Sequence, residues 1–317
     1  MSGSSGIPRR VSVPAAAKIN LDLRVLGKRA DGYHELRTIF QTISLRDTLE
    51  IAFTPGRKTE IELQDDPGIP DNLVLRAARL AMEAMRAAGR VEMRLIKRIP
   101  MGAGLGGGSS DAAAVLLALP VLAGRPLGLD ALAGLAARLG SDVPFFLLGG
   151  TAVGIGRGTE LFPLPDAPAR FGLLVAPGVH VDTARAYAEL SPGLTTESQQ
   201  NKIFSFQSQT WNRGGREPAC NDFEAVVFRQ HRGLARLKKR LIEAGASLAM
   251  MTGSGSGVFG LFDTREEITL ALESLGTLGK VYRISLVSRQ RYRSLWWRAL
   301  KEHITQTTWP PQSRYPR

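Results

Sequence analysis

Five glycines lie within residues 100–110, between a segment that alternates like a β-strand and a helix-like segment. The run reads Pro-Met-Gly-Ala-Gly-Leu-Gly-Gly-Gly-Ser-Ser. Glycine can take positive φ angles and lets a bulky ligand approach the main chain. The first amides of the following helix would point outward with a partial positive charge, and we expect Ser109 or Ser110 to cap that helix. The run therefore predicts a loop that binds an anion, most often phosphate.

The glycine spacing alone does not decide which class of phosphate site this is. Gly102, Gly104 and Gly107 match Gly-x-Gly-x-x-Gly, but a dinucleotide site requires an acidic residue about 20 positions further on, after a second strand. Asp130 has roughly that spacing and lies in helical sequence instead. A Walker loop requires Gly-Lys-Ser/Thr, and a protein kinase requires an HRD-type loop and a DFG triplet. The sequence contains none of these, so we interpret the loop as a phosphate cradle of another class.

Most of the positive charge lies at the C-terminal end. The chain has 317 residues, 44% of them hydrophobic, and a net charge of +12. Residues 280–317 hold nine Lys or Arg and one Glu, which gives this segment a net charge of +8. A phosphate-rich ligand would account for the small excess in the rest of the chain. The tail is either solvated or binds a nucleic acid or a membrane surface.

Cysteine and histidine give no sign of a disulfide or a metal centre. Cys220 is the only cysteine, so no intramolecular disulfide can form, which fits a cytoplasmic protein. The four histidines are scattered and show no metal-ligand spacing, so the metal ligands are unknown. The apolar, uncharged run at residues 143–156 is too short to cross a bilayer, and the first ten residues lack the apolar core of a signal peptide.

The chain length suggests two domains, and prolines at residues 163–168 mark the boundary between them. We expect a disordered leader at 1–10, an N-terminal domain at 11–164, a C-terminal domain at 165–288 and a basic tail at 289–317. Strands are predicted near residues 19–25, 36–45, 48–53, 60–63, 91–99, 171–176, 248–251, 258–262 and 281–287, with strand-like sequence also at 143–164. Helices are predicted at 72–88, from Ser110 with a disturbance at Pro120, and at 129–139, 183–190, 222–244 (with a break at Gly233), 265–275 and 294–304. The last of these is expected to dock on the second domain, and residues 191–220 are expected to form an irregular surface loop.

Polar residues interrupt the first strand at positions that share one face. Residues 19–25 alternate between apolar and polar side chains, so Lys18 and Asn20 point away from the apolar side. Asp142 follows the glycine that ends the helix at 129–139. The cluster Thr-Gly-Ser-Gly-Ser-Gly at 252–257 lies between two predicted strands and is either a hairpin turn or a second ligand loop.

The order of the Lys18 strand, the glycine loop and the cluster at 252–257 resembles the GHMP kinase superfamily. Within it, three further strings resemble the branch whose acceptor is a cytidine-diphosphate-linked methylerythritol, over residues 13–288. They are Ala-Lys-Ile-Asn-Leu at 17–21, Gly-Lys-Arg-Ala-Asp-Gly-Tyr-His-Glu-Leu at 27–36 and Leu-Gly-Ser-Asp-Val-Pro at 139–144. Ala103 stands where that family commonly has glycine.

The resemblance implies an α/β (α+β) fold of two domains with the active site in the cleft between them. It implies ATP-dependent transfer of the γ-phosphoryl group to the 2-hydroxyl of the cytidine-diphosphate-linked methylerythritol, in non-mevalonate isoprenoid precursor biosynthesis. Mg²⁺ would bridge the ATP phosphates. Neither a nucleic acid nor a membrane is expected as a partner, and the protein is expected to be a monomer or a homodimer.

The resemblance also implies roles for particular residues. Lys18 and Asp142 match the catalytic pair, in which Asp142 would orient the acceptor hydroxyl and Lys18 would neutralise developing charge. Acceptor contacts are implied for Asn20, Tyr33, His34, Thr183 and Tyr187. ATP contacts are implied for Asn72, Lys97, Pro100, Met101, Gly102, Ala103, Gly104, Leu105, Gly106, Gly107, Gly108, Ser109 and Ser110, with Ser109 also a candidate Mg²⁺ ligand.

Two other interpretations stay open at this point. One is a GHMP kinase for another small alcohol, of the homoserine or mevalonate type. The other is a nucleic-acid-binding protein that shares the N-terminal fold and uses the basic tail at 289–317 as its contact.

Overall fold

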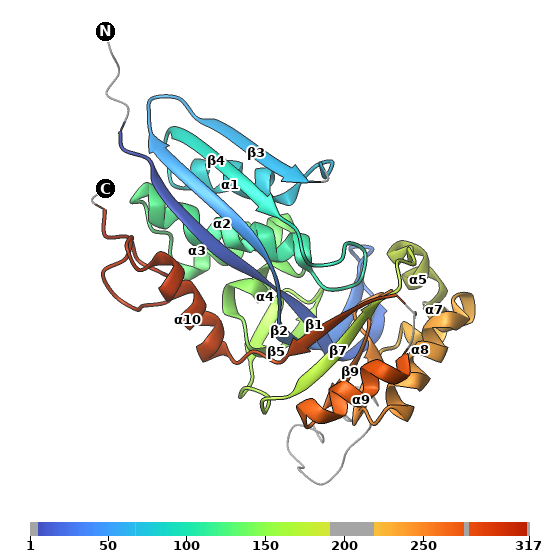
Figure 1. The fold of residues 1–317 in the computed structure, drawn as a ribbon. Coiled ribbons are helices and arrows are strands. Elements are labelled where there is room, and N and C mark those ends of the chain that lie inside the picture. Colours follow the sequence, from blue (N-terminus) through green and yellow to red (C-terminus); the bar gives the residue numbers. More distant parts are fainter. Residues whose placement is uncertain (1–5, 67, 191–218, 276–278, 316–317) are drawn as a thin grey trace.

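Two β-sheets with helices packed on them make up the part of the chain that the computed structural model describes, residues 6–66, 68–190, 219–275 and 279–315 (Figure 1). The first sheet has the order β3-β4-β2-β5-β6, and β1 pairs with β2 along nearly its whole length. Its strands are β1 (Arg9–Lys28), β2 (His34–Pro55), β3 (Glu60–Asp66), β4 (Gly89–Ile96), β5 (Thr151–Gly156) and β6 (Glu160–Pro163). The second sheet is antiparallel, in the order β10-β7-β9-β8. Its strands are β7 (Phe171–Ala176), β8 (Leu248–Met251), β9 (Val258–Phe262) and β10 (Lys280–Ser285).

The helices divide between the two sheets. The described helices are α1 (Leu73–Ala84), α2 (Gly107–Ala123), α3 (Leu129–Leu139), α4 (Val143–Leu148), α5 (Thr183–Leu190), α7 (Glu224–Gln230), α8 (Arg232–Glu243), α9 (Arg265–Leu275) and α10 (Arg289–Leu300). Figure 1 shows α1 and α2 beside the first sheet and α8 and α9 beside the second, while α3 packs on α1 and α2. α2 is apolar on all sides and buried from Ser110 to Leu122, so it forms the centre of the first core.

Strand β1 runs through three hydrophobic cores. Its first half, with Val11 and Val13, packs into the core under the first sheet. Ala17 and Ile19 pack between the glycine loop and the second sheet, while Leu23 and Val25 reach the core of the second domain. The segment of β1 that bears Lys18 and Asn20 therefore lies where the two halves of the molecule meet.

The C-terminal segment packs on the first domain, not on the second as predicted. Tyr292, Trp296 and Leu300 on α10 are all buried in the core that contains α2 and α4. Aromatic side chains at helical spacing bury large areas wherever a complementary apolar surface exists, and the sequence did not identify that surface. The predicted end of the disordered leader at residue 10 was also wrong, because Arg9 and Arg10 belong to β1 and pair with Phe53 and Ala52.

Several predicted element boundaries were wrong for local physical reasons. α2 begins at Gly107 and continues through Pro120 to Ala123, because a proline in the last turn removes only one helical hydrogen bond. Residues 143–148 are helical, since a short apolar run does not distinguish strand from helix and Pro144 suits a first helical turn. β2 is one continuous strand, and the break between α7 and α8 falls at His231. The predicted loop at 191–220 lies outside the described residues except for its last two.

Candidate active site

A cleft of about 900 Å³ opens where β1, the glycine loop, α5 and the cluster at 252–257 come together. This volume is large enough for a nucleotide with part of a second substrate. Every predicted site residue lines this cleft except Asn72 and Ser110. Asn72 caps α1 through a hydrogen bond from the Val74 amide, and the Ser110 hydroxyl donates to the Ala16 carbonyl, so both side chains hold the fold together.

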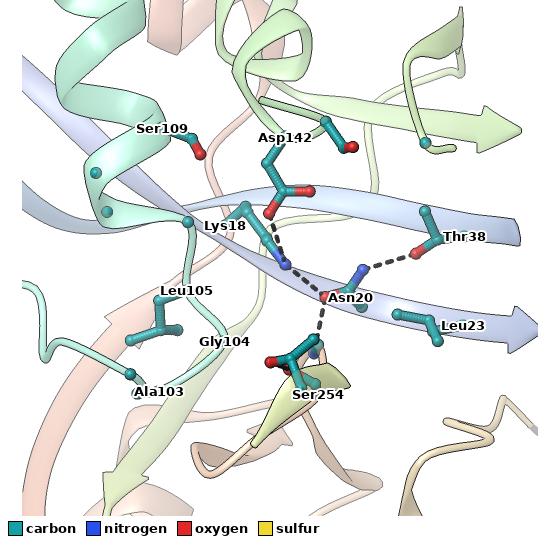
Figure 2. A pocket seen from close by; sticks show the side chains of 18 of the residues that line it. Lys18, Asn20, Leu23, Thr38, Ala103, Gly104, Leu105, Ser109, Asp142 and Ser254 are labelled. Atoms are coloured by element: carbon teal, nitrogen blue, oxygen red, sulfur yellow. Dashed lines mark hydrogen bonds and ion pairs between the residues drawn. The ribbon is translucent and has the colours of Figure 1, made fainter. Parts of the chain in front are cut away.

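Lys18 and Asp142 lie next to each other in the wall of the cleft (Figure 2). The Lys18 ammonium lies 3.5 Å from Asp142 Oδ2 and donates a hydrogen bond of 2.8 Å to Asn20 Oδ1. Asp142 is the residue before α4, and its carboxylate does not cap that helix. The carboxylate is therefore free of a capping role and faces the cleft beside the lysine.

Asn20 is oriented by contacts on both sides of its amide. Its Nδ2 donates 2.7 Å to the Thr38 hydroxyl, which in turn donates 2.7 Å to the Asp22 carbonyl. Its Oδ1 accepts from Lys18 and, at 2.9 Å, from the Gly253 amide. Because the Thr38 hydroxyl proton is committed to Asp22, only the NH₂ end of Asn20 can face Thr38. The oxygen is thereby turned toward the Lys18 ammonium.

The glycine loop follows the shape that its sequence predicts. Gly102, Gly104 and Gly106 have φ angles of 68°, 73° and 67°, in the left-handed region that glycine adopts without strain. Gly106 precedes α2, and the amides of the next residues belong to a first helical turn whose N–H groups have no intrahelical partner. The prediction that Ser109 or Ser110 caps α2 was wrong, since Gly106 holds that position with no side-chain cap. The main-chain amides of the first turn of α2 therefore face the cleft without a side-chain cap, and such amides bind anions.

The two glycine clusters touch each other. The Ser256 and Gly257 amides donate to the Gly102 and Ala103 carbonyls. A side chain on Gly104 would overlap the Thr252 carbonyl oxygen. The cluster at 252–257 is thus more than a hairpin turn and is not a separate site. It belongs to the second domain and packs directly against the glycine loop of the first domain.

Aromatic rings line the end of the cleft beyond Asn20. His34 stacks on Tyr187 with ring centroids 4.6 Å apart, and the Arg157 guanidinium lies 3.4 Å from the centroid of Tyr33. Burial, and then the charge of Lys28, lower the pKa of His34. Burial, and then the Asp142 charge, raise the pKa of Tyr187. Both groups are therefore neutral near pH 7.

Lys97 lies beneath the glycine loop between two buried carboxylates. It pairs with Asp47 and, at 2.7 Å, with Asp111. Burial raises the pKa of Asp111 to about 7, against the lowering effect of Lys97. Asp47 also accepts the Ile99 amide at 2.8 Å. This cluster fixes the end of β4 and the start of α2 around the loop.

The sequence did not reveal that Arg157 and Thr38 line the cleft or that Asp111 pairs with Lys97 beneath the glycine loop. Arg157 follows β5, and only the pairing of β5 with β2 brings it to Tyr33. Thr38 carried a usable signal, because it is a polar residue in β2, the strand that pairs with β1, and its hydroxyl meets Asn20 on the same face of the sheet. Among the described residues, no three His, Cys, Asp or Glu side chains gather as a metal site. Within the described part of the chain, no helix has both the length and the apolar character needed to cross a membrane.

A phosphate loop at a helix start, facing an ion pair in a two-domain cleft, defines a kinase that acts on a small molecule. Two family models match the chain, "GHMP kinases N terminal domain" at residues 72–150 and "GHMP kinases C terminal" at 206–280. The chain is 68% identical over 311 residues to the 4-diphosphocytidyl-2-C-methyl-D-erythritol kinase of Solibacter usitatus (strain Ellin6076), covering 97% of this chain and 98% of that one. It is 42% identical to the enzyme of the same name from Pelotomaculum thermopropionicum, covering 86% of this chain and 94% of that one.

This chain therefore belongs to the 4-diphosphocytidyl-2-C-methyl-D-erythritol kinase family of GHMP kinases. A crystal structure of 4-(cytidine 5'-diphospho)-2C-methyl-D-erythritol kinase superposes with a TM-score of 0.72 at 38% identity, covering 87% of this chain and 98% of that one. A mevalonate kinase from L. major superposes with a TM-score of 0.66 at 16% identity, covering 91% of this chain and 99% of that one, and it shows the fold alone. The predicted fold class and kinase family are confirmed.

Proposed function

We propose that this protein transfers the γ-phosphoryl group of ATP to the 2-hydroxyl of 4-diphosphocytidyl-2-C-methyl-D-erythritol in the cleft described above. The observation that carries the proposal is the 3.5 Å approach of Lys18 to Asp142 beside the open amides of the glycine loop. Together with the family membership, this arrangement brings a proton acceptor, a cation and a phosphate cradle into one cleft.

Asp142 orients the acceptor hydroxyl and accepts its proton. The side chain of Asp142 is 33% exposed, so its carboxylate can meet a hydroxyl that enters the cleft. In phosphoryl transfer through a loose transition state the attacking hydroxyl needs little deprotonation before bond formation. A carboxylate beside an ammonium is basic enough for that role.

Lys18 stabilises the charge that develops during transfer. Its ammonium is buried and already fixed by Asn20. A fixed cation in a water-poor site stabilises developing negative charge on the phosphoryl oxygens without reorganising. We therefore assign charge stabilisation to Lys18 and its alignment to Asn20.

The glycine loop binds the ATP phosphates through main-chain amides. Gly107, Gly108 and Ser109 lie in the first turn of α2 and line the cleft. A helix N-terminus supplies both donors and a partial positive charge to a phosphate.

The donor groups in this cleft fit Mg²⁺ held mainly through ATP. Mg²⁺ usually keeps several waters and binds through one or two protein oxygens plus substrate phosphates. Ser109 and Asp142 offer a hydroxyl and a carboxylate on the cleft wall. When bound, the ion would neutralise charge on the ATP phosphates.

The cytidine end of the acceptor binds among Tyr33, His34 and Tyr187. Their rings offer apolar faces to a pyrimidine, and a neutral imidazole presents one donor and one acceptor to a base edge. Burial and the charge of Lys28 lower the pKa of His34, which favours that neutral form. Arg157 stands over Tyr33 and can neutralise the acceptor diphosphate.

A panel of acceptors tests the proposal. The purified protein is incubated with ATP and Mg²⁺ and with 4-diphosphocytidyl-2-C-methyl-D-erythritol, mevalonate or homoserine in turn. ADP release is followed, and the phosphorylated carbon is identified by ³¹P NMR. We expect turnover with the cytidylated acceptor and phosphorylation of its 2-hydroxyl. Faster turnover with mevalonate or homoserine would overturn the choice of acceptor.

A further inference from the structure

Helix α4 joins the ion pair to the C-terminal segment of the chain. It has six residues and begins directly after Asp142. The Phe146 ring packs against Gly106, where an added Cβ would lie 2.9 Å from the ring and 3.3 Å from Lys18 Cε. Any shift of α4 along or about its axis therefore moves the Asp142 carboxylate relative to Lys18.

The end of this short helix is held from outside. The last four carbonyls of a helix have no partner within it. The Phe145 carbonyl accepts the Gly149 amide at 2.9 Å. The next two carbonyls accept side chains of the C-terminal segment, with Tyr292 Oη donating 2.6 Å to Phe146 and Trp309 Nε1 donating 2.9 Å to Leu147.

Both donors are themselves fixed. Tyr292 is 2% exposed, and Gly149 has no Cβ that would overlap its ring. Trp309 packs against Tyr292 and Trp296 with ring centroids 6.3 Å and 6.5 Å away. Arg289 anchors the start of the segment through hydrogen bonds to the Leu164 and Thr151 carbonyls. The segment is thus a rigid support rather than a loose tail.

We propose that residues 288–315 act as a positioning element for the ion pair, because Tyr292 and Trp309 fix the end of α4 and thereby the place of Asp142. This inference rests on the proposed role of Asp142 in phosphoryl transfer. Tyr292 and Trp309 touch no substrate and are positioning residues. The phenol and the indole act on catalysis only through the carboxylate at the other end of α4.

The test compares two tyrosines of the same segment. Tyr292→Phe removes only the hydroxyl that holds α4. Tyr315→Phe removes a hydroxyl that bonds His303 at 2.8 Å and does not touch α4. We expect Tyr292→Phe to lower kcat about tenfold with KM for ATP and acceptor within about twofold, since small displacements of a reacting group cost rate more than binding. Tyr315→Phe should leave kcat within about twofold of the wild type. If Tyr292→Phe does not fold, Trp309→Phe takes its place, because it removes the N–H group that holds the Leu147 carbonyl, and it should lower kcat in the same way.

Calorimetry separates positioning from stability. Tyr292→Phe and Tyr315→Phe should both lower Tm, and Tyr292→Phe should lower it more, because the Phe146 carbonyl that it leaves unpaired is buried. If Tyr292→Phe and Trp309→Phe both keep kcat within about twofold of the wild type while Tm falls, the segment is only structural and the proposal is wrong.

A double-mutant cycle tests whether Tyr292 acts through Asp142. In the Asp142→Asn background, single-turnover rates should change less than about twofold on adding Tyr292→Phe, because no carboxylate remains to be positioned. A full tenfold loss in that background would contradict the proposal. If Asp142→Asn alone keeps wild-type turnover, the proposed role of Asp142 fails, independently of any effect at Tyr292.

Discussion

Lys18 and Asp142 form an ion pair at the cleft in which the carboxylate is much more exposed than the ammonium. The two groups are 3.5 Å apart, and their side chains are 4% and 33% exposed. The ammonium is held from behind by Asn20, while the carboxylate keeps a face toward the acceptor. This asymmetry separates the two roles, since a buried cation is already aligned and a partly exposed carboxylate can bind the incoming hydroxyl.

Thr38→Val should disorder the alignment of Lys18 without touching the substrates. The variant keeps the shape of the side chain and removes the hydroxyl that accepts Asn20 Nδ2 and donates to Asp22. Asn20 can then rotate its NH₂ group toward the Lys18 ammonium, where no acceptor remains for that cation. We expect kcat to fall about 10- to 100-fold, because a misdirected electrostatic contact loses its transition-state effect. Steady-state kinetics check this, and Thr151→Val serves as the control, because this buried threonine bonds Gln41 and the Ala167 amide instead of Asn20.

Gly104→Ala should destabilise the fold far more than Gly102→Ala. Both positions have φ near +70°, so each alanine pays the left-handed strain of about 1 kcal/mol. Gly102 has open space around it, whereas a Cβ on Gly104 would overlap the Thr252 carbonyl. The overlap should add about 1–3 kcal/mol to the loss in free energy of unfolding. Urea denaturation of both variants measures the difference, and equal losses would show that the contact between the two glycine clusters is not tight.

Asp111 should make the stability of the wild type depend on pH. Its pKa is about 7 in the folded protein, raised by burial above the ordinary value of 3.8. Between these values the folded state binds a proton that the unfolded state has released. The Asp111 contribution to stability is thus fully present below about pH 4 and is lost as the pH rises through about 7. We expect the free energy of unfolding of wild type, relative to Asp111→Asn, to fall between pH 4 and pH 8 in chemical denaturation, and a rise would contradict the assignment.

The sequence predicted the parts of the site that are local and failed where distant segments meet. Alternation along β1 correctly grouped Lys18 with Asn20, and the glycine spacing correctly predicted the positive φ angles before α2. The family resemblance identified Asp142, which periodicity alone would have left at a helix end. No local pattern predicts that Gly104 packs on Thr252 or that Arg157 reaches Tyr33, because sheet pairing and domain packing decide both contacts.

The C-terminal segment is a second case in which the sequence predicted an element but not its tertiary contacts. Its aromatic residues indicated a docked helix, but the partner surface was predicted on the wrong domain. The surface exists only after α2 and α4 have folded together, so its shape is a tertiary property. Ser110 and Asn72 are predicted ATP contacts whose side chains bond backbone groups, and their contact with ATP stays a prediction.

The most direct test of the account is the single-turnover rate of phosphoryl transfer in Lys18→Met and Asp142→Asn, measured by rapid quench at saturating ATP and 4-diphosphocytidyl-2-C-methyl-D-erythritol. Both variants should lose at least about 100-fold in rate, since each removes a group that acts on the transferring phosphoryl or on the attacking hydroxyl. Affinities for both ligands should stay within about threefold of the wild type. Rates within tenfold of the wild type in both variants would contradict the claim that this ion pair carries the chemistry.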